Sequence, residues 1–331
     1  MTILSPWSKP IDPHILFPIG PYNQLLDNLN CKDHSKWLNS WQVRGGVDIG
    51  SSNWPVETKR DWFWGVGLPL LSDLERYLSR TNNRTLYGIS GLPGCGKTTL
   101  GKWVKAAYAE LNWSVDVISM DDFYLPYQEL KKAMSGNPWL VPRALPGSHE
   151  IELMEESIQN WQITGELKVP EFDKALRNGL GDRSRWNIST PKILIIEGWF
   201  LGCGLAKDLK NSTELFSQQD ESITSQEKDY QVIIQNSLKK YLPIWEKFER
   251  IWHLKAVNFL STKKWKAQQE ANLQRSRGAS IKGKSLKLFL RMIQTAIPKE
   301  SLESINSDVV AKLNTYREIT WIGLSKHEPK T

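Results

Sequence analysis

The segment GLPGCGKTT, residues 91–99, contains the residue types that bind the phosphates of a nucleotide. Gly91, Gly96, Lys97 and Thr98 fit the spacing GxxxxGK[ST], in which glycines let backbone amides close around phosphate oxygens. Lys97 would neutralise the β and γ phosphates, and Thr98 would ligate Mg²⁺. We therefore predict a site for ATP and Mg²⁺ whose nucleotide-binding residues are Gly91, Leu92, Pro93, Gly94, Cys95, Gly96, Lys97, Thr98 and Thr99.

This loop does not indicate whether the terminal phosphate goes to water or to a second substrate. The stretch SMDDFY, residues 119–124, follows an apolar run directly. Because the carboxyl ends of parallel strands open onto one edge of a sheet, Asp121 and Asp122 should face the phosphate loop. A carboxylate there can deprotonate the hydroxyl that attacks the γ-phosphorus. We assign this base role to Asp121 and substrate contacts to Asp122 and Tyr124; the alternative for either aspartate is that it caps the next helix.

A third acidic candidate ends the apolar run ILIIEGWF, residues 193–200. A glutamate after four apolar residues is costly to bury unless it has a partner, which favours a functional role for Glu197. Such a carboxylate commonly holds Mg²⁺ through water. We predict that Thr98 and Glu197 are the metal-binding residues.

Two turn-rich stretches, PRALPGSHE (142–150) and VPEFDKALRNGLGDR (169–183), combine Gly or Pro with cationic residues. A solvated loop is the ordinary explanation for any one of these cations. Together, on loops that flank one site, they favour an anionic acceptor. We predict that acceptor-binding residues in these two loops include Arg143, His149, Asp173, Lys174 and Arg183.

The net charge of +7 is concentrated in one segment, since residues 262–291 carry nine Lys or Arg and only Glu270, whereas the remaining 34 basic and 35 acidic residues nearly cancel. A solvated helix face is one explanation. Kinases also bring cations over the migrating phosphoryl group on a closing lid. We predict this lid role for Arg275 and Arg277, because guanidinium suits bidentate contact with phosphate.

The three cysteines lie far apart without a CxxC pair, which suits neither a disulfide framework nor a zinc site. Cys95 lies inside the phosphate loop, where the helix N-terminus and Lys97 would favour a reactive thiolate; the alternative is a small residue that fills space. The chain has no apolar window of the ~18 residues that span a bilayer, and its N-terminus does not resemble a secretory signal. We expect a cytoplasmic protein without membrane association.

The elements that must position these residues are predicted to be α/β. Short apolar runs alternate with amphipathic helices, and TLYGIS, SVDVIS, KILIIEG and RIWHLKAV suit buried parallel strands. Leu100, Trp103 and Val104 lie on one face of a helix directly after the phosphate loop. The stretch DVVAKLNTYREITWIGL indicates a hairpin. The expected fold is a three-layer arrangement of the P-loop NTPase type, with a parallel sheet flanked by helices.

The predicted domains are an N-terminal extension, residues 1–66, packed on the core and a P-loop kinase domain, residues 67–331. In the extension, SKWLNSWQV places Trp37, Leu38 and Trp41 on one helical face. The segment SDLE indicates a helix start near residue 72, with Ser72 as the cap. Within the kinase domain, residues 208–229 are polar and aperiodic, which predicts a surface loop insert, and residues 262–291 form the basic lid segment.

These motifs together resemble the plant and cyanobacterial type of D-glycerate 3-kinase, a family similar to phosphoribulokinase, uridine kinase and pantothenate kinase. The resemblance covers roughly residues 68–325, and RALPGSHE with EFDKALRNGLGDR is its most specific part. It implies ATP-dependent phosphorylation of D-glycerate to 3-phosphoglycerate and a mobile lid. Asp121 matches the D of the DxFY base motif, and no role carries over to Arg291, because LFLRMIQTAIPKESLESI departs from the family pattern.

Two other functions compete with this prediction. A uridine or pantothenate type of kinase uses the same base motif. A nucleic-acid-stimulated ATPase would explain the basic segment, and it would turn over ATP without a small acceptor. We expect a small-molecule acceptor, glycerate, and no nucleic-acid partner; the oligomeric state is left open.

Overall fold

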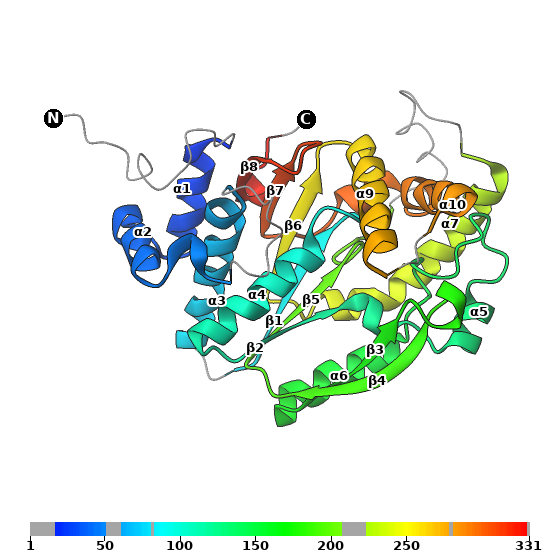
Figure 1. Cartoon of the computed structure of the whole chain (residues 1–331), viewed down its shortest axis with the longest axis horizontal. Helices are drawn as coiled ribbons and strands as arrows, with labels where there is room; N and C mark the ends of the chain where they lie inside the picture. The colour runs from blue at the N-terminus through cyan, green and yellow to red at the C-terminus, as the bar shows by residue number, and fades with distance from the viewer. Residues whose placement is uncertain (1–16, 51–60, 81–82, 207–222, 278–280, 330–331) are drawn as a thin grey trace.

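The computed structural model describes residues 17–50, 61–80, 83–206, 223–277 and 281–329, and their centre is a six-stranded sheet (Figure 1). The strand order is β2-β5-β1-β6-β7-β8, parallel from β2 to β7 and antiparallel between β7 and β8. The strands are β1 (Thr85–Gly91), β2 (Val115–Ser119), β5 (Ile193–Gly198), β6 (Arg250–Ala256), β7 (Val309–Leu313) and β8 (Ile319–Leu324). Every predicted apolar run forms a strand, and the predicted hairpin is β7–β8.

Helices cover both faces of the sheet because alternate strand residues point to opposite sides. In β5, Ile193 and Ile195 belong to one core, and Leu194 and Ile196 belong to the other. The first core is formed with α1 (Ile19–Asn28), α2 (His34–Val43), α3 (Leu68–Arg80) and α4 (Lys97–Leu111). The second is formed with α5 (Tyr127–Ala133), α6 (Ile151–Thr164), α7 (Ser225–Leu238), α8 (Leu242–Trp245), α10 (Gly283–Thr295) and α11 (Lys299–Glu303). The predicted three-layer α/β fold is confirmed.

A separate two-stranded hairpin of β3 (Leu167–Asp173) and β4 (Asp182–Ser189) lies beside α6 (Figure 1). The prediction of a loop over residues 169–183 is therefore wrong at both ends of that range. Val169 and Phe172 are buried although they are three positions apart, because the register of the hairpin shifts between Glu171 and Phe172 and interrupts the alternation of the strand. Only residues 174–181 connect the two strands.

The N-terminal extension shares the first core with the kinase domain. Trp37, Leu38 and Trp41 are buried on one face of α2, as predicted. The boundary placed between residues 66 and 67 falls inside a continuous helical stretch, because a π-helical segment, Trp62–Gly67, runs directly into α3.

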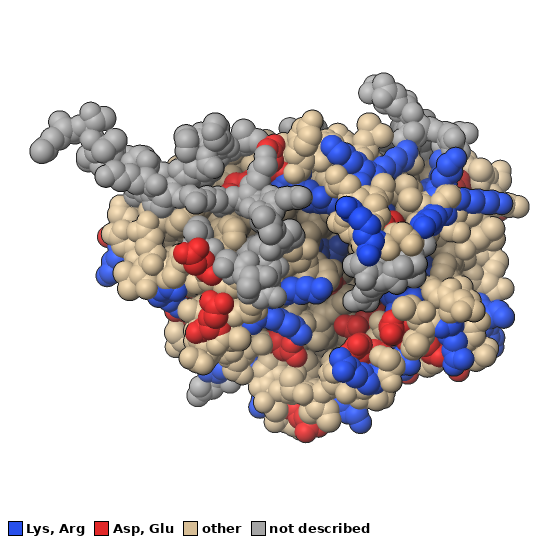
Figure 2. Space-filling model, viewed as in Figure 1, with Lys and Arg blue, Asp and Glu red and all other residues tan. Residues whose placement is uncertain are grey.

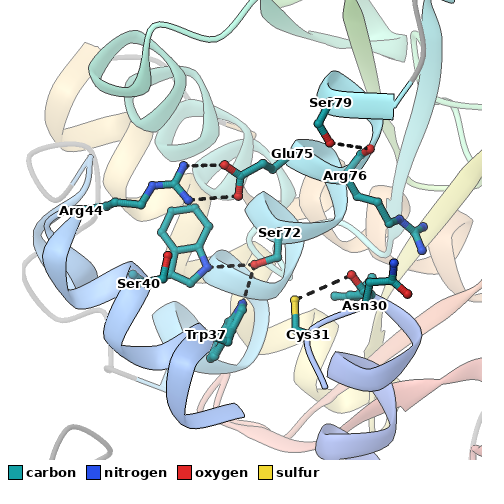
Figure 3. Close-up of a pocket in the computed structure, with 11 residues that line it drawn as sticks. Asn30, Cys31, Trp37, Ser40, Arg44, Ser72, Glu75, Arg76 and Ser79 are labelled. Atoms are coloured by element: carbon teal, nitrogen blue, oxygen red, sulfur yellow. Dashed lines mark hydrogen bonds and ion pairs between the residues drawn. The ribbon is translucent and has the colours of Figure 1, made fainter. Parts of the chain in front are cut away.

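The prediction that Ser72 caps the start of a helix is wrong. Helix α3 begins at Leu68, and the Ser72 hydroxyl donates to the Leu68 carbonyl oxygen at 2.9 Å. The Ser72 hydroxyl oxygen in turn accepts hydrogen bonds from the indole N–H groups of Trp37 at 2.7 Å (Figure 3) and Trp41 at 2.9 Å. The upstream residues are buried on all sides and extend the helix, so Ser72 serves as a link between α2 and α3 instead of a cap.

A cavity of about 230 Å³ lies along this junction of the extension with α3. On its wall, the Arg44 guanidinium donates two hydrogen bonds to Glu75, at 3.0 and 2.9 Å (Figure 3). The Arg44 guanidinium also stacks over the Trp41 ring at 4.1 Å. These polar groups bind one another across the junction, which holds the extension against α3.

We expect Ser72→Ala to lower the free energy of unfolding by about 1–3 kcal/mol, because it removes the acceptor that two buried indole groups share. Urea unfolding followed by far-UV circular dichroism measures this change. Ser79→Ala is the matched control, since Ser79 lies on the exposed side of the same helix and bonds only to the Arg76 carbonyl among the contacts described; it should stay within about 0.5 kcal/mol of wild type. Equal stability of both variants would contradict the role given to Ser72.

The predicted surface insert, residues 208–229, extends too far. Residues 207–222 lie outside the described part of the chain, and α7 begins at Ser225. Thr224 Oγ1 accepts from the Glu227 N–H at 3.2 Å, and a Glu227 carboxylate oxygen accepts from the Thr224 N–H at 2.8 Å. This capping box is visible in the letters TSQE, but the helix buries Gln231 and Gln235 in place of apolar residues, which hides its period. Among the described residues, no helix has the length and apolar character needed to cross a membrane.

Candidate active site

The phosphate loop joins β1 to α4 at the carboxyl edge of the sheet. Gly94 and Gly96 have φ of 82° and 110°, in the left-handed region that favours glycine. A Cβ at Gly94 would lie 2.8 Å from the Trp265 Cβ, so the loop passes too close to its neighbour for a side chain. Lys97 is the buried first residue of α4, and its ammonium donates to the Leu92 carbonyl at 3.3 Å. The loop thus has the glycine conformations and helix start that a phosphate site requires.

Cys95 is fully buried within this loop. Burial raises the pKa of its thiol, and the charge of Lys97 offsets this only in part. This burial and the raised pKa disfavour the predicted thiolate and favour the alternative, a residue that fills space beside Gly91, where a Cβ would lie 2.9 Å from the Cys95 sulfur.

The two predicted metal-binding residues are in direct contact. The Thr98 hydroxyl donates to Glu197 Oε1 at 2.7 Å. Glu197 is buried near the end of β5, and the strand register sets it opposite Ile89 of β1 and Ser119 of β2. Among the described residues, no group of three or more His, Cys, Asp or Glu could hold a metal. A hydroxyl and one carboxylate nevertheless fit Mg²⁺, which is commonly held by one or two carboxylates together with substrate phosphates.

The two adjacent aspartates have different environments. Asp122 Oδ2 accepts from the Ser119 N–H at 3.1 Å, and Oδ1 accepts from the Phe172 N–H at 3.4 Å. Burial raises the pKa of Asp122 to about 6, although these main-chain hydrogen bonds favour its ionised form. Asp122 thus completes a capping box with Ser119 at the turn Met120–Phe123 and ties this turn to β3, which agrees with the capping alternative; its contact with the substrate stays a prediction.

Asp121 lies at the centre of a cluster of polar side chains. Its Oδ1 accepts from the Tyr124 hydroxyl at 2.9 Å, and its Oδ2 accepts from the Lys174 ammonium at 2.6 Å. His149 Nε2 lies 4.0 Å from Oδ1. Burial alone would raise the pKa of the Asp121 carboxyl, but Lys174 and His149 hold this pKa well below its usual range. Asp121 is therefore ionised at neutral pH.

His149 is a buried neutral imidazole instead of the predicted cation. Burial lowers its pKa, and its ring stacks on Tyr124 with centroids 4.5 Å apart. The Tyr241 hydroxyl accepts from the Gly147 N–H at 3.0 Å and lies 2.9 Å from His149 Nδ1. The direction of this hydrogen bond depends on the tautomer of the imidazole, and the other ring nitrogen, Nε2, faces Asp121.

Other predicted acceptor-binding residues support the β3–β4 hairpin. Arg143 donates from Nη1 to the carbonyl oxygens of Gly179 at 3.0 Å and Leu180 at 2.9 Å. Arg183 pairs with Glu150 and donates from Nε to the Tyr124 carbonyl at 3.1 Å. Asp173 accepts from the Ala175 N–H at 2.8 Å. Arg183 and Asp173 therefore stabilise the hairpin, and Lys174 is the hairpin cation that contacts Asp121.

The basic segment forms most of α9 (Phe259–Arg277) and α10. Lys and Arg side chains gather over these two helices on the face shown in Figure 2. Arg275 is exposed and donates to Asn272 Oδ1 at 2.6 Å, so it does not contact the phosphate loop in this arrangement. The side chain of Arg277 and residues 278–280 lie outside the described part of the structure. Arg291 pairs with buried Glu227 at 2.7 Å, which links α10 to α7.

Comparison with curated proteins finds an uncharacterized kinase of Schizosaccharomyces pombe that is 30% identical over 217 residues, or 62% of this chain and 76% of the relative. The chain belongs to this kinase family. The chloroplastic D-glycerate 3-kinase of Arabidopsis thaliana is 27% identical over 216 residues, which span 61% of this chain and 44% of that enzyme. The comparison with models of protein families found no match.

The structure of D-glycerate 3-kinase from Cryptococcus neoformans superposes on this kinase with a TM-score of 0.64 and 19% identity. The superposition covers 91% of this chain and 98% of the other. The predicted resemblance is confirmed, since this kinase is homologous to D-glycerate 3-kinase and has the P-loop kinase fold.

Sequence reasoning missed Arg317, a residue of the β7–β8 turn. In this kinase its Nε donates to the Gly94 carbonyl of the phosphate loop at 2.8 Å, and its guanidinium lies over the Trp265 ring at 5.3 Å. It also donates to Gln268 at 3.0 Å. Arg317 thus joins the phosphate loop to α9. No local pattern marks it, because the residues it contacts are distant in the sequence.

Proposed function

We propose that this kinase transfers the γ-phosphate of ATP to a hydroxyl of D-glycerate and forms 3-phosphoglycerate. The observation that carries the proposal is the position of Asp121 and Lys174. Asp121, a candidate base on the turn that follows β2, contacts the Lys174 ammonium of the β3–β4 connection, and β2 ends beside Glu197 of the metal pair. Homology to D-glycerate 3-kinases supports the choice of acceptor.

In the proposed reaction, the loop amides and Lys97 bind the phosphates, and Thr98 and Glu197 hold Mg²⁺. When bound, Mg²⁺ neutralises charge on the phosphate oxygens. Asp121 orients the acceptor hydroxyl and takes its proton as the new O–P bond forms. Tyr124 and His149 keep the Asp121 carboxylate in place during this proton transfer.

The hairpin cations favour an acid as the acceptor. Arg143 contacts Gly179 and Leu180 of the β3–β4 connection that carries Lys174. Burial lowers the pKa of the Lys174 ammonium, but the charges of Asp121 and Glu197 raise it above its usual range. A carboxylate on the acceptor would bind between Lys174 and Arg143, while its hydroxyl faces Asp121. A nucleoside lacks this anionic group, which disfavours the uridine-kinase alternative.

A coupled ADP-release screen tests the proposal. Small hydroxy acids, pantothenate, nucleosides and sugars serve as acceptors, and NMR assigns the position of the phosphate in the product. D-Glycerate should accelerate ADP formation strongly over the rate in water. The assignment is wrong if pantothenate or uridine is phosphorylated while glycerate is not.

We also propose that Arg275 and Arg277 act on a closing lid. Arg275→Ala or Arg277→Ala should lower kcat at least roughly tenfold, about 1.4 kcal/mol of transition-state stabilisation, with a smaller effect on ATP affinity. Steady-state kinetics and ATP titration measure the two effects. If both variants keep near-normal kcat and lose polynucleotide binding, the cations over α9 and α10 indicate a nucleic-acid-stimulated ATPase instead.

A further inference from the structure

The ion pair between Lys174 and Asp121 joins an exposed side chain to a half-buried one. The ammonium lies 2.6 Å from Asp121 Oδ2, and the exposed fractions of the two side chains are 53% and 24%. Lys174 is the first residue after β3, in the connection to β4. Its long stem and single ammonium group allow it to exchange partners at small cost.

While this pair is formed, Asp121 is a weak base. Its carboxylate already accepts hydrogen bonds from Tyr124 and Lys174, and His149 Nε2 lies 4.0 Å away. Asp122 is the remaining ionisable group beside it. A carboxylate stabilised in this way accepts a proton from a hydroxyl less readily, since general-base catalysis weakens as the pKa of the base falls. The structure therefore shows the candidate base in a restrained arrangement.

We propose that Lys174 is a latch on Asp121, and that an anionic group of the acceptor opens it by taking over the Lys174 ammonium. This inference rests on the proposed function and adds a role for the acceptor's charge. An arriving carboxylate would meet two cations, because Arg143 contacts Gly179 and Leu180 of the same β3–β4 connection that carries Lys174. Arg143 itself is anchored on Gly179 and Leu180, so it provides a fixed positive charge that can hold the arriving carboxylate while Lys174 turns from Asp121 to the same anion.

The latch controls one proton transfer. When the acceptor is bound, the proton of its hydroxyl passes to Asp121 and the hydroxyl oxygen forms a bond to the γ-phosphorus. The bond between this phosphorus and the oxygen that bridges it to the β-phosphate breaks. The electron pair of that bond leaves on ADP. If water replaces the acceptor, the corresponding bonds form and break, and the product is inorganic phosphate. Because Lys174 occupies Asp121 when no acceptor anion competes for it, the base is withheld from water.

The test uses Lys174→Met in the full chain. Arg185→Met is the matched control, because Arg185 belongs to the same hairpin and also forms a 2.6 Å ion pair, with Glu171 and away from Asp121. ADP release is measured without acceptor, with D-glycerate and with glycerol, which keeps the hydroxyls and lacks the carboxylate. Lys174→Met should raise acceptor-free ADP release at least about fivefold, since the base becomes available to water. Its preference for glycerate over glycerol should fall at least about tenfold.

The gain in hydrolysis should disappear in the double variant Lys174→Met with Asp121→Asn, and Arg185→Met should behave as wild type. The melting temperature shows whether the Lys174→Met protein is folded. The latch is overturned if the folded variant keeps the wild-type rate of ATP hydrolysis and the wild-type preference for glycerate over glycerol. Failure of the proposed function is seen separately, as a wild-type enzyme that does not phosphorylate glycerate. The latch is then judged by acceptor-free hydrolysis alone.

Discussion

Asp121→Asn is expected to lower kcat by roughly 10²-fold or more while ATP binding persists. Asparagine keeps the shape of the side chain and its contact with the Tyr124 hydroxyl, but it cannot accept the proton of an attacking hydroxyl. The nucleotide site is unaffected because the described contacts of Asp121 are to Tyr124, Lys174, His149 and the Ser119 hydroxyl rather than to the phosphate loop. Steady-state kinetics with saturating acceptor, together with calorimetric titration of ATP, measures both parts of the expectation.

Asp122→Asn is the control at the neighbouring position. One of its two carboxylate oxygens is replaced by an amide that cannot accept from the Ser119 or Phe172 N–H. We expect a loss of about 1–3 kcal/mol in unfolding free energy and a much smaller change in kcat. If Asp122→Asn abolishes turnover and Asp121→Asn does not, the roles of the two residues are reversed.

Lys97→Met is expected to lower kcat/KM for ATP by roughly 10²- to 10³-fold, the scale measured when one preorganised charge-stabilising group is removed from an active site. Methionine preserves the buried stem of Lys97 at the start of α4, so the loop should keep its conformation. The lost interaction is the attraction between the ammonium and the charge on the migrating phosphoryl group. Kinetics over a range of Mg-ATP concentrations separates the effects on kcat and KM.

Lys102→Met provides the comparison for Lys97→Met on the same helix. Lys102 is an exposed residue of α4, five positions beyond Lys97. We expect its kcat/KM to stay within about twofold of wild type, a change of under 0.5 kcal/mol. Equal kinetics for the two variants would show that the loop after β1 does not handle the transferred phosphate.

Local patterns predicted the elements well where each pattern was strong. The apolar runs became strands because both faces of a parallel sheet are buried, which leaves a signal in every residue of the run. The predictions were least accurate for elements that lack a regular pattern of buried apolar residues. The β3–β4 hairpin has a polar face, α7 buries Glu227 and glutamines, and α3 starts upstream of Ser72 inside a run buried on all sides.

The sequence predicted which kinds of residue form the site and at which edge of the sheet they lie, because the topology of an open sheet brings the ends of β1, β2 and β5 to one edge. This is why the phosphate loop, Asp121 and Glu197 could be grouped from the sequence. The sequence could not show which of the two adjacent aspartates caps the turn and which one faces the site. That choice depends on main-chain N–H groups of Ser119 and Phe172, and Phe172 belongs to another element.

The sequence by itself determined the sheet, the nucleotide loop with its Thr98 hydroxyl and the family, because these depend on short-range patterns of glycine, charge and apolar residues. Only the tertiary structure decided the charge states and the partners. Burial lowers the pKa of His149 and raises that of Cys95, which favours the uncharged form of both, and Lys174 reaches Asp121 across 53 positions of the chain. Desolvation and Coulomb energies depend on distances between residues remote in sequence, and those distances are set only when the elements pack.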